Sequence, residues 1–195
     1  MKCEKIGLIL MPFFLLVSCN VEKEIDLNKY LNLEYLIELD NEEQGKYNCS
    51  VKSTWFREPE SKYFDKIILY SNDGFVMDSK TSLKANYEYK YVLNGVEQTE
   101  NKVIESINYI SGGAEIDFRF PNIGDFKSLI IEYEFSLLVD YPTLRKNFNL
   151  NCSYFHSRFN SDKPLDLVKN KKNEFVTNLY VDSKTITNSY EYIPN

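Results

Sequence analysis

The chain has 195 residues, with 23 basic and 29 acidic side chains and a formal net charge of −6. An acidic surface repels phosphate groups, so neither nucleic-acid binding nor attraction to anionic lipid headgroups is expected. There is a single histidine, which excludes zinc sites built from two or three histidines, and the sequence predicts no metal and no cofactor.

Residues 1–18 have the layout of a secretory signal peptide. Lys2 and Lys5 precede an apolar run from Ile6 to Val17, and a basic start followed by such a run is typical of secretion signals. The run has 12 residues, whereas a membrane-spanning helix needs roughly 20. The sequence therefore predicts a cleaved signal rather than a transmembrane anchor.

Leu16-Val17-Ser18-Cys19 resembles the lipobox at which bacterial lipoprotein precursors are cut and acylated. The resemblance implies that residues 1–18 are lost and that Cys19 receives a diacylglycerol thioether and an N-acyl chain such as palmitate. Two or more acyl chains make a stable membrane anchor. Cys19 is thus expected to be a lipidation site and not a redox residue.

Residues 19–29 follow as the lipidated cysteine and a short charged tether. Position 20 is asparagine, and not the aspartate that retains lipoproteins of enteric bacteria in the inner membrane. The resemblance therefore implies a lipid-anchored protein of the cell envelope, in the outer membrane. The sequence leaves open whether the protein faces the periplasm or the cell surface.

Residues 30–195 are expected to form one domain, although two small ones would also fit. Apolar residues alternate with polar ones in five segments, the pattern of half-buried antiparallel strands. These segments are 31–39, 47–51, 85–93, 131–139 and 148–154. Turn sequences lie between them, and Asn94-Gly95 is the clearest hairpin signal. The predicted fold is all-β, an antiparallel β-sandwich that is immunoglobulin-like in general architecture.

Two segments, 100–110 and 161–170, have spacings that would also fit a helix. In the first of them, Val103, Ile107 and Ile110 suit a helix as well as a strand, so the assignment stays open.

Several short sequences recur at an offset of about 100 residues. Leu33–Asp40 resembles Tyr133–Asp140, and Asn48-Cys49-Ser50 recurs as Asn151-Cys152-Ser153. The shared order is consistent with a strand-level duplication, with halves of about 30–124 and 125–195.

Cys49 and Cys152 are the two cysteines that remain once Cys3 leaves with the signal and Cys19 carries lipid. Both occupy the apolar phase of predicted strands, in a compartment where disulfides persist. We predict a disulfide between them, and the alternative is two separate buried thiols.

The sequence does not predict a catalytic residue, and the chain is not expected to be an enzyme. His156 has Ser153 and Ser157 nearby, but there is no Gly-x-Ser-x-Gly motif, so a structural histidine is favoured. Glu132 and Glu134 would suit a carboxylate-based hydrolase. The simpler interpretation is that they lie on the solvent-facing side of a strand.

Trp55 and Arg57 are the candidate ligand-binding residues, because the strand that ends at Trp55 runs out into a polar loop. The alternative for Trp55 is a position in the core. The favoured function is a non-catalytic lipoprotein that binds or scaffolds another envelope component. The alternative is a carbohydrate-binding module of a polysaccharide uptake system, which would need an exposed Trp55 or tyrosines such as Tyr87, Tyr89 and Tyr91. A carboxylate-based hydrolase is the third possibility.

Overall fold

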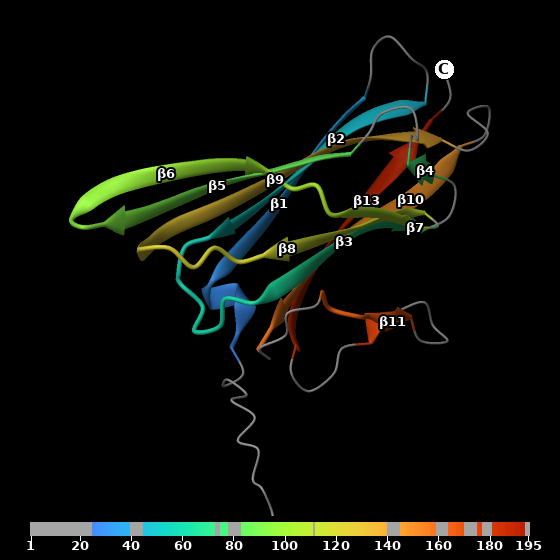
Figure 1. The fold of residues 1–195 in the computed structure, drawn as a ribbon. Coiled ribbons are helices and arrows are strands. Elements are labelled where there is room, and N and C mark those ends of the chain that lie inside the picture. The colour runs from blue at the N-terminus through green and yellow to red at the C-terminus, as the bar shows by residue number, and fades with distance from the viewer. Residues whose placement is uncertain are drawn as a thin grey trace, which may run out of the picture.

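The computed structural model is a sandwich of two antiparallel β-sheets (Figure 1), which confirms the predicted fold class. It describes residues 25–39, 45–72, 75–77, 83–110, 112–139, 145–158, 164–169, 175–176 and 181–193. The predicted signal peptide and Cys19 lie outside these residues. Within them, no helix has the length and apolar character needed to cross a membrane.

The first sheet has the strand order β1-β2-β9-β5-β6, and β4 also pairs with β9. Its strands are β1 (Leu31–Leu39), β2 (Lys46–Trp55), β4 (Phe75–Met77), β5 (Lys84–Leu93), β6 (Val96–Val103) and β9 (Asp125–Val139). A short 3-10 helix, η1 (Leu27–Lys29), precedes β1. Asp26 caps this helix, because its carboxylate accepts from the backbone N–H of Asn28.

The second sheet has the strand order β13-β10-β3-β8-β7. Its strands are β3 (Phe64–Asn72), β7 (Ile107–Ile110), β8 (Gly113–Arg119), β10 (Lys146–Ser157) and β13 (Val181–Tyr192). A separate pair, β11 (Val168–Lys169) with β12 (Phe175–Val176), lies between β10 and β13 in the chain. The described residues therefore show strand, not helix, in both segments whose spacing also suited a helix.

The core fills the space between the two sheets. Alternate residues of β9 and β2 point inward from the first sheet, and buried residues of β3, β8 and β10 meet them from the second. The outer face of the second sheet is also partly covered, because Ile68, Phe155 and Val181 form a small cluster with Leu165 and Leu167. Period-two alternation thus places one set of side chains in the core and leaves the outer face of the first sheet in solvent.

The hairpin that joins β5 and β6 turns at Asn94-Gly95, as predicted. Leu93 pairs with Val96, and the φ angles of Asn94 and Gly95 are +54° and +79°. Both turn positions are left-handed, as a two-residue type I′ turn requires. The hairpin projects beyond the body of the sandwich (Figure 1).

The strands that carry the repeated sequences do not repeat their pairing. β1 pairs with β2 in the first sheet, whereas β9 and β10, which carry the second copy, lie in different sheets. The duplication, with its halves 30–124 and 125–195, therefore stays a prediction of the sequence.

Candidate functional site

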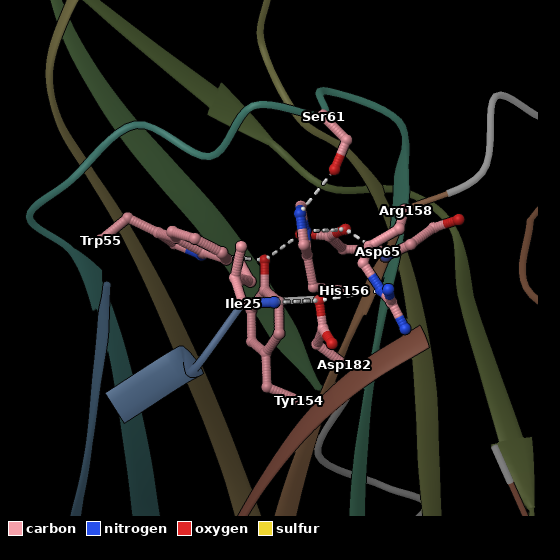
Figure 2. A network of polar contacts seen from close by, with 9 residues as sticks. Ile25, Trp55, Ser61, Asp65, Tyr154, His156, Arg158 and Asp182 are labelled. Atoms are coloured by element: carbon pink, nitrogen blue, oxygen red, sulfur yellow. Dashed lines mark hydrogen bonds and ion pairs between the residues drawn. The ribbon is translucent and has the colours of Figure 1, made fainter. Parts of the chain in front are cut away.

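A buried polar network connects the two sheets with the loop that follows β2 (Figure 2). Asp65 lies near the start of β3, His156 lies near the end of β10, and Ser61 belongs to the loop. The Nδ1 atom of His156 donates to Asp65 Oδ1 at 2.8 Å. Its Nε2 atom lies 2.9 Å from Ser61 Oγ. In the neutral ring with Nδ1 protonated, Nε2 accepts from the serine hydroxyl.

Asp65 is the acceptor at the centre of the network. Besides the imidazole, Tyr154 donates its hydroxyl to Asp65 Oδ2 at 2.6 Å, and the backbone N–H of Ser157 donates to Oδ1 at 3.3 Å. Trp55 Nε1 in turn donates to the Tyr154 hydroxyl at 3.1 Å. Burial and the nearby Asp65 carboxylate raise the pKa of Tyr154 well above its usual value, so the phenol keeps the proton that it donates.

Serine, histidine and aspartate in this order have the contacts of a nucleophile, its base and the group that orients the base. The burial of these three residues excludes a catalytic role. His156 and Asp65 have no exposed surface, and Ser61 is only 2% exposed, so a substrate cannot reach the hydroxyl. The network instead satisfies a buried carboxylate, as buried charges require, and His156 is a hydrogen-bonded structural histidine.

Ser61 and Asp65 are members of this network that the sequence did not point to. The serines that were considered have other roles: Ser153 bonds to Thr185 on β13, and Ser157 contributes its backbone N–H to Asp65. Ser61 is 95 residues from His156 in the chain and belongs to no motif, so no local signal relates the two.

A second polar group connects the residues before β1 to the second sheet. Asp182 on β13 pairs with Arg158, with 3.3 Å between Nε and Oδ2. The same carboxylate accepts from the backbone N–H of Ile25 at 3.3 Å (Figure 2). Lys184 also donates to the carbonyl of Leu31, at the start of β1. The tether is therefore fixed to the sandwich where it enters.

A third group lies on β3 and β8. The ammonium of Lys66 is 3.1 Å from Glu115 and 3.2 Å from Asp117. Burial raises the pKa of the Asp117 carboxyl even though Lys66 lowers it. Among the described residues, no group of three or more histidine, cysteine or acidic side chains is arranged to hold a metal ion.

Cys49 and Cys152 are two free, buried thiols in this structure, which is the alternative to the predicted disulfide. They come from opposite sheets, β2 and β10. The phenol of Tyr35 is close enough to both thiols for their charged forms to raise its pKa. Desolvation raises the pKa of each thiol to about 12, and the two cysteines act as small apolar residues.

We therefore expect both thiols to react only after unfolding. In the native protein at neutral pH, a thiol reagent should label neither Cys49 nor Cys152, and in denaturant without reductant it should label both. Because their pKa is raised by folding, the stabilisation from the protonated thiols is present below about pH 9 and is lost as the pH rises toward 12. A mass two hydrogens lower, with no labelling in denaturant, would show a bridge instead.

The two residues proposed for ligand binding differ in their exposure to solvent. Trp55 has no exposed surface, and its ring meets Phe120, Tyr154 and His156. Arg57 is exposed in the loop that follows. Trp55 is therefore a core residue, because it is the last inward-facing position of β2. The strand ends at Trp55, as expected, and the structure shows the core position that was the alternative to a ligand platform.

The outer face of the first sheet carries two adjacent hollows. One, of about 290 Å³, runs from Leu36 and Glu38 on β1 to Glu134 on β9 and Lys84 on β5. The other, of about 490 Å³, continues from Lys52 and Glu132 to Asn86, Asn101 and Val103. Together they cross the sheet from β1 to β6, and we call them the outer trench.

Charges of both signs line the outer trench. Lys52 and Glu132 form an ion pair at 3.0 Å, and Lys84 lies opposite Glu134 in the pairing of β5 with β9. The two glutamates that the sequence suggested as a hydrolase pair are thus exposed and lie beside cations. They lie on the solvent-facing side of β9, which is the simpler interpretation that the sequence offered.

Comparison with known proteins identifies no family for the chain. No family model and no curated protein matches it. Among solved structures, it is similar to a collagen-binding domain from a Staphylococcus aureus adhesin, with 12% identity, a TM-score of 0.41 and coverage of 80% of this chain and 97% of that one. The collagen-binding subdomain of Enterococcus faecalis surface protein ACE gives 9% identity, a TM-score of 0.41 and coverage of 87% and 98%. At these scores the likenesses identify no functional residue of this chain.

Proposed function

We propose that the protein is a lipid-anchored, non-catalytic binding protein of the bacterial cell envelope. In this proposal Cys19 carries the acyl chains, in the outer membrane, and the outer trench binds another envelope component. The observation that carries the binding role is the outer trench itself, which crosses five paired strands of one sheet. The lipobox-like sequence at Leu16–Cys19 supports the anchor.

The chemistry of the outer trench favours a polypeptide as the partner. Exposed apolar residues border it at both ends, Leu36 on β1 and Val103 on β6. Between them lie lysines, glutamates and the amides of Asn86 and Asn101. A protein segment presents apolar side chains and both signs of charge at such spacings, and complementary charges fix the register of the contact.

The two competing functions lose the residues on which they depended. A sugar platform needs an exposed aromatic face, but Trp55 and Tyr89 are fully buried, and Tyr87 and Tyr91 pack against the core. A carboxylate-based hydrolase needs an acid in a shielded cleft, whereas Glu132 and Glu134 are exposed to solvent.

The lipid anchor has a direct test in Cys19→Ala. We expect the wild-type protein to be found by mass spectrometry as a chain that begins at an acylated Cys19, and the variant to accumulate as a longer, unacylated precursor. The physical reason is that the thioether needs the cysteine sulfur. A native mature chain that begins at any other residue would contradict the anchor.

The outer trench has a separate test by site-specific photocrosslinking in native membranes. A crosslinker at Asn86 or Glu134 should trap one defined partner, and Lys84→Glu should remove that product by reversing the charge in the trench. Thr187 serves as the control, because it is exposed on β13 in the other sheet. The same product from Thr187, or a product that Lys84→Glu leaves unchanged, would contradict binding at the outer trench.

A further inference from the structure

Four large apolar side chains are exposed on loops and on a hairpin tip of the sandwich. They are Phe56 (48% exposed), Leu93 (44%), Val96 (57%) and Ile123 (42%). Phe56 follows β2, Leu93 and Val96 flank the Asn94-Gly95 turn, and Ile123 lies between β8 and β9. We call these residues the apolar rim. They do not pack in the core, so fold stability does not explain them.

Strand pairing places the apolar rim at one end of the sandwich. Leu129 pairs with both Trp55 and Tyr89, so β5 and β6 continue past the end of β2 toward their turn. The loop with Ile123 is held beside the same hairpin, because Tyr89 donates its hydroxyl to the Ile123 carbonyl at 3.0 Å. At the neighbouring Gly124, a Cβ would lie 2.6 Å from the Val92 carbonyl oxygen, so this loop packs closely on β5.

The tether enters the fold at this same end. The N–H of Phe56 donates to the Tyr30 carbonyl at 2.9 Å, directly after η1, and Leu31 pairs with Trp55. In Figure 1, η1, the loop after β2 and the tip of the β5–β6 hairpin lie toward the same end of the molecule. Cys19 precedes Ile25 by six residues, which span at most about 20 Å.

We propose that the apolar rim rests on the surface of the lipid bilayer that holds acylated Cys19. This inference rests on the proposed acylation. The short tether brings the end of the sandwich to the membrane, and it thereby holds these four side chains close to the lipid surface. Apolar side chains such as Phe and Leu gain free energy when they leave water for the boundary between lipid headgroups and acyl chains. The nearby Arg57 has a stem that can lie along apolar surface while its charge stays in water.

The charges beside the apolar rim indicate a zwitterionic rather than an anionic lipid surface. Lys62 pairs with Glu58 in the loop that carries Phe56, and Lys29 pairs with Asp26 at η1. Lys29 and Lys62 are thus neutralised locally, and the contact depends mainly on apolar side chains. Such docking would make the strands of the first sheet rise from the membrane and hold the outer trench away from the lipid.

The test uses the full acylated protein in phosphatidylcholine vesicles, labelled with an environment-sensitive dye through Phe56→Cys or Leu93→Cys. The control is Ile193→Cys, an exposed position that follows β13 at the opposite end. Cys49 and Cys152 are buried and do not compete for the dye. We expect a blue-shifted emission at positions 56 and 93, and quenching by lipid-attached quencher at least about twofold stronger there than at position 193, because interfacial side chains lie at the headgroup level.

Each other outcome overturns the inference in a recognisable way. Protein that sediments with the vesicles but is quenched equally at positions 56 and 193 would reject the docked orientation and leave the lipid anchor intact. Protein that neither sediments nor carries an acyl mass on Cys19 would reject the anchor and the docking together. A dye shielded at position 56 without vesicles, together with a doubled solution mass, would show that a second copy of the chain covers the apolar rim.

Discussion

Replacing Asp65 by alanine is expected to lower the free energy of unfolding by about 3–5 kcal/mol, because three buried donors lose a charged acceptor and each unsatisfied group costs roughly 1–3 kcal/mol. The carboxylate has no exposed surface and accepts hydrogen bonds from His156, Tyr154 and the backbone of Ser157. Alanine leaves these donors buried without an acceptor, and each unsatisfied group costs free energy. Urea denaturation of the mature chain without its acyl chains measures the change.

Two further variants separate the network from a general effect of removing an acid. Asp65→Asn keeps one oxygen for His156 but loses the charge, so its loss of stability should lie between those of wild type and Asp65→Ala. Asp125→Ala removes an exposed aspartate at the start of β9 and should change stability by no more than about 0.5 kcal/mol. Equal losses for Asp65→Ala and Asp125→Ala would refute the central role of Asp65.

The strands that could be predicted from alternating apolar and polar residues are those with one face exposed to solvent. β1 and β9 have their polar side chains on the outer face of the first sheet, and the sequence shows a regular period of two there. The hairpin at Asn94-Gly95 was also predictable, because its turn residues tolerate left-handed angles. For these elements, local pattern and tertiary environment agree.

The strands without this pattern have other environments. β3 contains the run Ile67-Ile68-Leu69, and all three are buried because Ile68 is covered from outside by Phe155 and Val181. A strand buried on both faces shows no alternation. β6 is the opposite case, since nearly all its residues are exposed. It is a strand because it pairs with β5, and not because one of its faces is apolar.

The candidate site depended even more on tertiary contacts. Asp65 and Ser61 meet His156 only because β3 pairs with β10 and the loop after β2 folds over them. Asp65 and Ser61 are each more than 90 positions from His156 in the chain, so no spacing in the sequence relates them to it. The outer trench likewise draws its lining from strands that are not consecutive in the chain.

Replacing Trp55 by alanine is expected to lower the free energy of unfolding by about 3–5 kcal/mol, the range for large aromatic residues in a core. The indole is fully buried, its ring packs against Phe120 and His156, and its N–H donates to Tyr154. The variant therefore loses packing and also one partner of the buried network. Denaturation followed by far-ultraviolet circular dichroism measures the loss, since the signal does not depend on the tryptophan.

The neighbouring Phe56 provides the matched control for Trp55. Phe56 is also aromatic and directly follows β2, but it is half exposed, so Phe56→Ala should change the stability of the unacylated chain by no more than about 0.5 kcal/mol. Trp55→Phe should fall between the two alanine variants, because the smaller ring keeps part of the packing and loses the hydrogen bond to Tyr154. A Trp55→Ala protein as stable as wild type would place the indole outside the core, and it would return Trp55 to the candidates for a ligand platform.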